Sequence, residues 1–134
     1  MKFEQKARAV KLIRKVGAAL AAGLIYLVLV RVTGWRIPCV FYELSGKYCP
    51  GCGITRMFVA LSRLDFAAAA GYNLLALALL PVGAAVGVAK AVGYVRHGEC
   101  KTGRLETAGW LLVLALCAVF TVMRNMPEYA FLAP

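Results

Sequence analysis

Most hydrophobic residues of this 134-residue chain lie in long apolar runs, and most charged residues lie between those runs. A run of about 17–25 apolar residues can cross a bilayer as a helix, because the hydrocarbon core is roughly 30 Å thick. Runs that approach or reach this length occupy residues 16–32, 74–95 and 107–123. The pattern therefore predicts three transmembrane helices, the second of them capped at its start by the side chain of Asn73.

A fourth segment, residues 54–70, is apolar on one side only. Its hydrophobic residues recur three and four positions apart, which is the spacing of one face of a helix, while Arg56 and Arg63 repeat seven residues apart. A helix with this pattern lies along the membrane interface or dips into it as a re-entrant element. Asp65 is placed to cap a second short helix at 66–70. We therefore expect an all-α membrane protein with three transmembrane helices plus an interfacial or re-entrant amphipathic helix.

The chain is expected to form one membrane domain, residues 1–134, whose first apolar run is an uncleaved anchor. The stretch RVTGWRIPC after that run offers no small-residue site for signal-peptide cleavage. In chain order, the pattern predicts a basic cytoplasmic tail (1–15), a first span (16–32), a cysteine-rich loop (33–53), the interfacial helix (54–70), a second span (74–95), a cytoplasmic loop (96–106), a third span (107–123) and an outer tail (124–134).

Composition and charge agree with a membrane location. Hydrophobic residues make up 62% of the chain, compared with roughly 45–50% in soluble domains. The net charge of +10 lies mainly beside the apolar runs, where positive-inside bias and contact with the lipid bilayer account for it, so we expect no nucleic-acid partner. Ten lysines and arginines share the side of the N-terminus, against six on the other side. A multi-pass plasma membrane protein with a cytoplasmic N-terminus is predicted.

The candidate chemistry is concentrated in residues 48–56, YCPGCGITR. In the predicted topology, Cys39, Cys49 and Cys52 lie together on the outer, extracytoplasmic side, whereas Cys117 lies within the third span and Cys100 falls on the cytoplasmic side. Glu43 is the one carboxylate close to them in the sequence, and no histidine is near.

Three uses of these cysteines stay open, and we favour them in the order given. In the first, Cys39 pairs with Cys49 or Cys52 to tie the loop down, or the loop forms a structural or interaction site for a membrane or extracytoplasmic protein. In the second, Cys49 and Cys52 are a redox pair for thiol-disulfide exchange, because a thiolate at a helix start is stabilised. In the third, all three cysteines bind zinc or iron, although a structural zinc site needs four ligands. We expect no other cofactor.

Other residues have candidate roles as well. Arg56 could form an anion or lipid-contact site with three more polar residues predicted on the outer side, because a guanidinium binds a phosphate or carboxylate through two hydrogen bonds; the alternative is that all four anchor helix ends. The other three are Asn73, Arg124 and Asn125. Gly83 and Gly87 have the G-x-x-x-G spacing of close helix contacts, either within the chain or in a homodimer.

The sequence also resembles a known family. The segments IPCVFYELSGKYCPGCGITR, LSRLDFAAAAGYNLL and RNMP…FLAP are similar to a family of small bacterial integral membrane proteins catalogued only as a domain of unknown function. The resemblance covers about residues 35–127, and the family's Cys-Pro-x-Cys-Gly-x-Thr-Arg box, upstream cysteine and Tyr-Asn pair match Cys39, Cys49, Pro50, Cys52, Gly53, Thr55, Arg56, Tyr72 and Asn73. Here Pro38 precedes Cys39, whereas in the family a proline often follows that cysteine. The resemblance implies no known activity. Without a nucleotide-binding loop, a Ser-His-Asp set or a carboxylate pair, we expect a protein that is not an enzyme.

Overall fold

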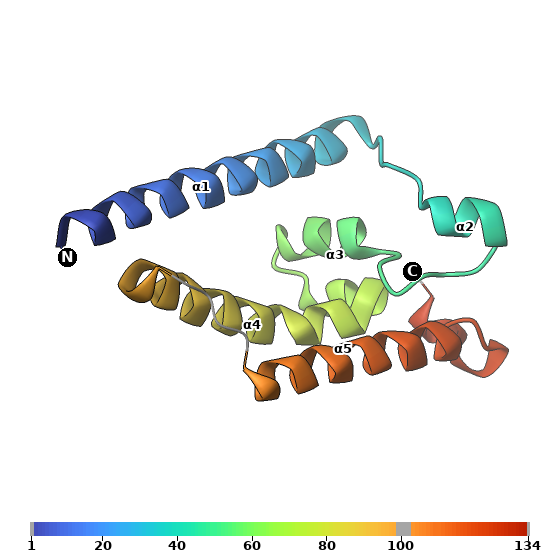
Figure 1. Cartoon of the computed structure of the whole chain (residues 1–134). Helices are drawn as coiled ribbons and strands as arrows, with labels where there is room; N and C mark the ends of the chain where they lie inside the picture. The colour runs from blue at the N-terminus through green and yellow to red at the C-terminus, as the bar shows by residue number, and fades with distance from the viewer. Residues whose placement is uncertain (1, 99–102, 134) are drawn as a thin grey trace.

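The computed structural model describes residues 2–98 and 103–133, and these residues contain helices and no β-strand. The elements, labelled in Figure 1, are α1 (Lys2–Thr33), α2 (Val40–Ser45), α3 (Ile54–Leu61), α4 (Phe66–His97), α5 (Arg104–Met123) and a 3-10 helix, η1 (Pro127–Leu132). The all-α prediction is confirmed. Part of the expected cytoplasmic loop at 96–106, including Cys100, lies outside the described residues.

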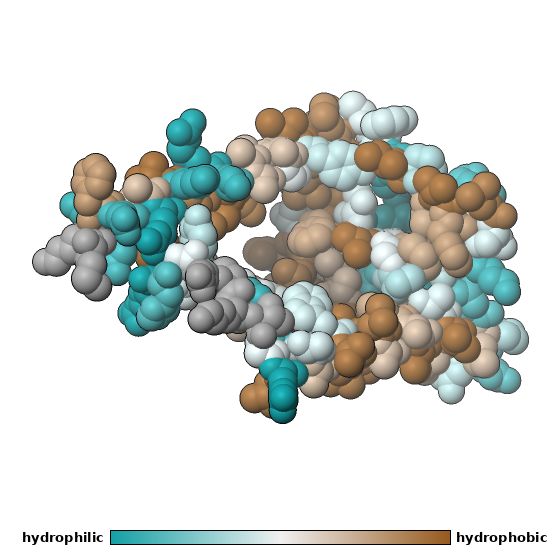
Figure 2. All heavy atoms as spheres, viewed as in Figure 1, coloured by the Kyte–Doolittle hydropathy of each residue, from teal (hydrophilic) through white to brown (hydrophobic). Residues whose placement is uncertain are grey.

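Three of these helices are long and apolar enough to cross a membrane. They are the segments Phe3–Thr33, Phe66–His97 and Arg104–Met123, each with an 18-residue stretch of mean hydropathy 2.0 of which at most 6% is buried. Apolar helices that stay uncovered by protein are suited to contact with lipid tails. Figure 2 shows hydrophobic residues along the outer sides of α5 and of the C-terminal half of α1, and hydrophilic residues toward the N-terminal end of α1. The fold class is that of an all-α membrane protein, and its basic tail is the first part of α1 rather than a separate segment.

The ends of the long helices are sorted into two groups (Figure 1). At one end, the start of α1 lies beside the end of α4, where the side-chain amide of Gln5 donates to the carbonyl of Arg96 at 3.5 Å. At the other end, the segments 34–65 and 124–133 come together, and we call them the head. The head contains α2, α3 and η1.

Residues 54–70 form two helices joined by a tight turn. Leu64 has a φ of 59°, a left-handed conformation that is uncommon for a residue other than glycine, and it ends the α3 region. Asp65 then caps α4 by accepting a hydrogen bond from the backbone N–H of Ala68 at 2.9 Å, as the sequence indicated. The helix that it starts runs on into the second apolar run instead of ending at residue 70.

Asn73 interrupts α4 with a non-helical backbone, φ −161° and ψ 89°. Its side-chain oxygen accepts from the N–H of Ala76 at 2.9 Å, so the predicted cap is present and the helix is kinked there. A small core of Met57 and Ala60 from α3 and Ala69 from α4 fixes α3 against this kinked region. The kink and the core together position the turn that precedes α3.

Three glycines of the apolar helices make no close contact with another helix. A methyl group added at Gly17, Gly83 or Gly87 would meet no other atom within 4 Å. Close helix contact through these glycines within the chain, one of the two roles expected for them, is therefore not observed among the described residues. The face that carries Gly83 and Gly87 is open.

Candidate cysteine centre

Three cysteines from two loops of the head converge. Cys39 immediately precedes α2, and Cys49 and Cys52 lie in the turn between α2 and α3. The backbone N–H of Cys52 donates to the carbonyl of Cys49 at 3.1 Å, which closes the turn, and Gly53 with a φ of 87° starts α3. The Sγ atom of Cys49 lies 3.5 Å from that of Cys39 and 3.3 Å from that of Cys52. All three are free thiols, with their sulfur atoms within 4.8 Å of one another.

The three thiols have different electrostatic surroundings. Cys52 is buried, and burial together with its hydrogen bonds to Cys39 and Cys49 raises the pKa of its thiol to about 12. The pKa of the Cys39 thiol is lowered, chiefly by the backbone N–H of Tyr42 in the first turn of α2 and then by the thiol of Cys52. Cys39 is therefore the side chain of this pair that becomes a thiolate more readily.

Arg124, directly after α5, lies beneath the cysteine turn and is 2% exposed. One guanidinium nitrogen, Nη1, donates to the carbonyls of Cys49 and Cys52 at 3.1 and 3.0 Å, and Nη2 donates to the carbonyl of Tyr72 at 3.4 Å. The guanidinium carbon is 5.0 Å from the ring centre of Phe120, within range of a cation–π contact. Burial lowers the pKa of Arg124, but arginine stays protonated at neutral pH. The backbone of the cysteine turn is thus hydrogen-bonded to a buried positive charge.

No described carboxylate pairs with Arg124, and its Nε is buried without a hydrogen-bond partner among the described residues. A buried charge is stable only when other groups replace its hydration. Here three carbonyl dipoles and the aromatic rings of Phe120 and Tyr48 do so. The carbonyls are neutral, so the net charge of this site remains positive while the thiols are protonated.

Two asparagines hold the same turn from either side. Asn73 is fully buried, and its amide nitrogen donates to the carbonyls of Pro50 and Cys52 at 2.8 and 3.1 Å. Asn125 accepts from the N–H of Tyr48 at 2.9 Å and donates to the carbonyl of the same residue at 2.8 Å. The backbone of the turn is therefore fixed by side chains from α4 and from the segment after α5.

The structure gives these polar residues a different geometry from the expected anion site. Asn73, Arg124 and Asn125 do come together, but their polar groups face the backbone of the cysteine turn. Arg56 instead lines a recess with three other arginines, Arg31, Arg36 and Arg63. The spacing of Arg56 and Arg63 was visible in the sequence, but their meeting with residues at the end of α1 was not.

Comparison with known proteins gives one family. Residues 39–87 match the model of a family described as a protein of unknown function, DUF2752. This part of the chain is similar to that family. The match begins at Cys39 and includes both cysteines of the turn and Asn73, whereas Arg124 and Asn125 lie beyond it. No curated protein and no solved structure matched the chain. The expected family is thus confirmed for this segment, and it brings no activity with it.

The DUF2752 segment contains a set of thiols with the spacing of a metal site. Sulfur ligands about 2.3 Å from a tetrahedral zinc ion lie roughly 3.8 Å from one another. The sulfurs of Cys39, Cys49 and Cys52, all within 4.8 Å, are close to that arrangement without a large movement of the backbone. Glu43 is not part of this close group, although it lines the adjoining recess of about 370 Å³ together with Cys39 and Cys52. Three protein ligands and one open position are available.

Proposed function

We propose that this membrane protein binds a zinc ion through the thiolates of Cys39, Cys49 and Cys52, and that the bound ion organises the head as a structural or interaction site. The observation that carries the proposal is the convergence of all three sulfurs within 4.8 Å, although the residues come from both sides of α2. A disulfide would use two of these thiols and leave the third without a role. A metal site uses all three, and the recess that Cys39 and Cys52 line gives water or a partner's ligand access to a fourth position.

The charge of the surroundings supports a metal-thiolate centre. Three thiolates and one Zn²⁺ ion carry a net charge of −1. Arg124 supplies a buried charge of the opposite sign and donates to the carbonyls of two of the ligand residues, Cys49 and Cys52. Opposite charges stabilise each other strongly where water is excluded. The centre would give Arg124 the negative partner that no described carboxylate provides.

Thiol-disulfide exchange is the competing function, and one contact favours it. The sulfur of Cys49 lies within 3.5 Å of both other thiols, so Cys49 could form a disulfide with either after small movements. In such a reaction two thiols of this chain are oxidised to one disulfide while a partner's disulfide is reduced to two thiols. The raised pKa of the Cys52 thiol disfavours Cys52 as the attacking group, because the attacking thiol must be a thiolate, whereas the lowered pKa of the Cys39 thiol suits that role.

Orientation and partners form part of the proposal. The excess of lysine and arginine on the side of the N-terminus supports a plasma membrane protein with its head outside the cytoplasm. The open face at Gly83 and Gly87 supports contact with a second copy in the bilayer. If Gly83→Leu leaves cross-linking between copies in native membranes as efficient as in the wild type, the proposed contact between copies is contradicted.

Metal content tests the function. The protein is purified in detergent without chelator, and zinc and iron are measured by mass spectrometry for the wild type and for Cys39→Ser, Cys49→Ser, Cys52→Ser and Cys117→Ser. We expect about one zinc per chain in the wild type and in Cys117→Ser, the matched control in α5, and a loss of most of the metal in the other three. A content of about one iron per chain in place of zinc would support the same three-cysteine site with a different metal ion.

The same samples decide between metal binding and exchange. They are alkylated without reductant, before and after treatment with a chelator, and each cysteine is followed by mass spectrometry. A metal centre protects the three thiols until the chelator is added. Metal-free protein with a disulfide between Cys49 and either neighbour would contradict metal binding and support exchange.

A further inference from the structure

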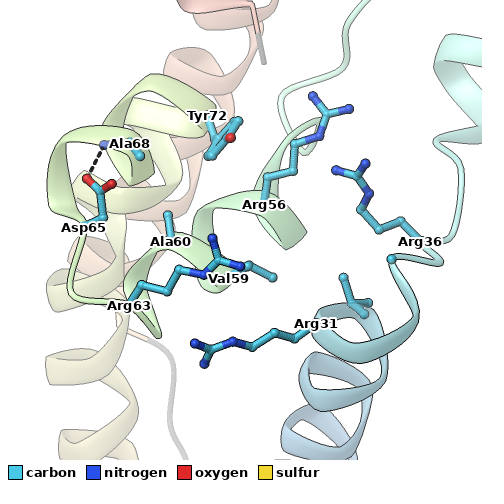
Figure 3. A pocket seen from close by; sticks show the side chains of 11 residues that line it. Arg31, Arg36, Arg56, Val59, Ala60, Arg63, Asp65, Ala68 and Tyr72 are labelled. Atoms are coloured by element: carbon cyan, nitrogen blue, oxygen red, sulfur yellow. Dashed lines mark hydrogen bonds between the residues drawn. The ribbon is translucent and has the colours of Figure 1, made fainter.

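A second recess in the head is lined by arginines. Arg31 comes from the last turn of α1, Arg36 from the loop that follows, Arg56 from α3 and Arg63 from the turn before α4. Figure 3 shows Arg31 and Arg36 reaching from the α1 side toward Arg56 and Arg63, with the guanidinium groups of Arg36 and Arg56 turned toward each other. The recess has a volume of about 380 Å³ and opens to the surface. Four positive charges from separate segments therefore surround one space.

The acidic residue in the lining is already engaged. Asp65 caps α4 through its hydrogen bond from Ala68, as the dashed line in Figure 3 marks. None of the four arginines forms an ion pair with a carboxylate in the described part of the chain, and Arg31 has one long hydrogen bond, of 3.4 Å, to the hydroxyl of Ser62. Positive charges this close repel one another unless an anion lies between them. The recess has four arginine charges against the one carboxylate of Asp65, so an excess of positive charge remains.

The position of the recess suggests where an anion would come from. It lies where α1 ends and α4 begins, at the end of two membrane-capable helices. Three exposed apolar residues are neighbours in sequence of residues that line the recess: Trp35, Leu64 and Phe66, with exposed fractions of 68%, 78% and 61%. Tryptophan and apolar side chains beside arginine are typical of the zone of lipid headgroups. Phosphate groups are the abundant anions of that zone.

We propose that this arginine recess binds a phosphate group, carried either by the headgroup of an anionic phospholipid or by a soluble phosphate compound. A guanidinium donates two parallel hydrogen bonds to phosphate oxygens, and arginine is therefore the usual residue for such sites. Arg36 and Arg56 also line the recess beside the cysteines, so a bound phosphate would lie next to that second recess. The inference does not depend on metal binding, because none of the four arginines belongs to the thiol cluster.

Tryptophan fluorescence provides a local readout. The chain has two tryptophans, and Trp110→Phe leaves Trp35, whose neighbours Gly34 and Arg36 line the recess. The protein is placed in phosphatidylcholine nanodiscs at constant ionic strength. In the first arm, phosphatidylglycerol with brominated acyl chains is added in increasing proportion, and quenching is compared with that by brominated phosphatidylcholine. In the second arm, inorganic pyrophosphate is titrated and its binding is measured by calorimetry.

We expect saturable binding in at least one arm. Saturation with phosphatidylglycerol alone would identify a lipid headgroup, saturation with pyrophosphate alone a soluble compound, and saturation in both a site for the phosphate group itself. The double variant Arg56→Gln with Arg63→Gln should weaken the affinity about tenfold or more. The double variant Arg56→Lys with Arg63→Lys keeps the charge but not the paired hydrogen bonds, and its affinity should lie between that of the wild type and that of the glutamine variant. Arg96→Gln, which removes one positive charge at the other end of the molecule, should change the affinity less than about twofold.

Two results would overturn the proposal. One is the absence of saturable binding in both arms with the wild-type recess, because four separate arginines that merely contact bulk lipid would respond in proportion to the lipid added. The other is a response of the glutamine variant equal to that of Arg96→Gln. Helical circular dichroism and a single elution peak confirm that each variant is folded, which the surface position of Arg63 makes the expected outcome.

Discussion

At the scale of the residue, Arg124 is the side chain that connects the largest number of segments in the head. Its hydrogen bonds reach the carbonyls of Cys49, Cys52 and Tyr72, so it joins the cysteine turn to α4 and to the end of α5. A lysine could not do this in the same space, because it offers one ammonium group and a shorter reach. The turn therefore depends on an arginine at this position.

The prediction for Arg124 follows from the carbonyls that it satisfies. Replacing it by methionine would take a donor from each of these carbonyls, although that of Cys49 keeps the N–H of Cys52 and that of Cys52 keeps the amide of Asn73. We expect a loss of about 2–3 kcal/mol in the free energy of unfolding. Lysine should recover less than half of that loss. Thermal unfolding in detergent, followed by circular dichroism, measures both. Arg96→Met, an exposed arginine at the opposite end, is the control and should behave as the wild type. An equally stable Arg124→Met would show that the guanidinium does not hold the turn.

The thiols themselves give a prediction about pH. In metal-free protein, the lowered pKa of Cys39 means that its thiolate forms at a lower pH than in an ordinary cysteine, whereas a pKa of about 12 leaves Cys52 protonated throughout the neutral and mildly alkaline range. Iodoacetamide should therefore modify Cys39 before Cys52 between pH 7 and 9. The rates are obtained for each residue by mass spectrometry.

The control for this order of reactivity is the unfolded chain. In denaturant, where burial and the neighbouring N–H groups are lost, the two thiols should react at similar rates. Faster reaction of Cys52 than of Cys39 in the folded protein would contradict the electrostatic description of the cluster.

At the scale of the element, the interruption of α4 links the membrane helix to the site. A continuous helix through residue 73 would satisfy its own backbone and leave the cysteine turn without the amide of Asn73. With its non-helical backbone, Asn73 caps the second part of α4 through Ala76 and donates to Pro50 and Cys52. The side chain of Asn73 thus replaces a hydrogen bond that the helix lacks at its interruption, and it also holds the cysteine turn.

Asn73→Ala should consequently cost more than the loss of an ordinary cap. Removing an exposed cap typically costs about 1 kcal/mol, and here the carbonyls of Pro50 and Cys52 each also lose a donor, so we expect about 2–3 kcal/mol. Asp65→Ala at the other cap of α4 is the matched comparison and should cost about 1 kcal/mol. Chemical unfolding in detergent measures both variants. Equal effects would mean that the contacts of Asn73 with the turn add nothing to stability.

At the scale of the whole molecule, the sequence was informative about elements and less so about their contacts. The length of the apolar runs was sufficient to predict three helices capable of spanning, because the bilayer thickness sets that length. The caps at Asp65 and Asn73 could be predicted because a capping residue acts within its own turn. The turn at Leu64 could not, since a left-handed conformation in leucine depends on the packing around it.

The features that could not be predicted from the sequence depend on contacts between residues far apart in the chain. Arg124 is 75 residues from Cys49 along the chain, and nothing in the local pattern of either residue indicates their hydrogen bond. Arg31 and Arg63 likewise belong to different elements, so the arginine recess exists only after α1 lies beside α3. The candidate residues could be found from their type and side of the membrane, but their partners required the folded chain.

The grouping of helix ends gives the last prediction, which concerns the orientation of the molecule. Because the start of α1 contacts the end of α4, these two ends share one side of any membrane that the helices cross, and the head occupies the other. The positive-inside bias predicts that the head is outside. In a cysteine-free background, Ser45→Cys in α2 should therefore react with a membrane-impermeant maleimide in intact cells. Arg104→Cys at the start of α5 should react only after the cells are permeabilised. The reverse labelling pattern would agree with the helix arrangement but place the head in the cytoplasm. Reaction of both sites in intact cells would show that α1, α4 and α5 do not all cross the membrane.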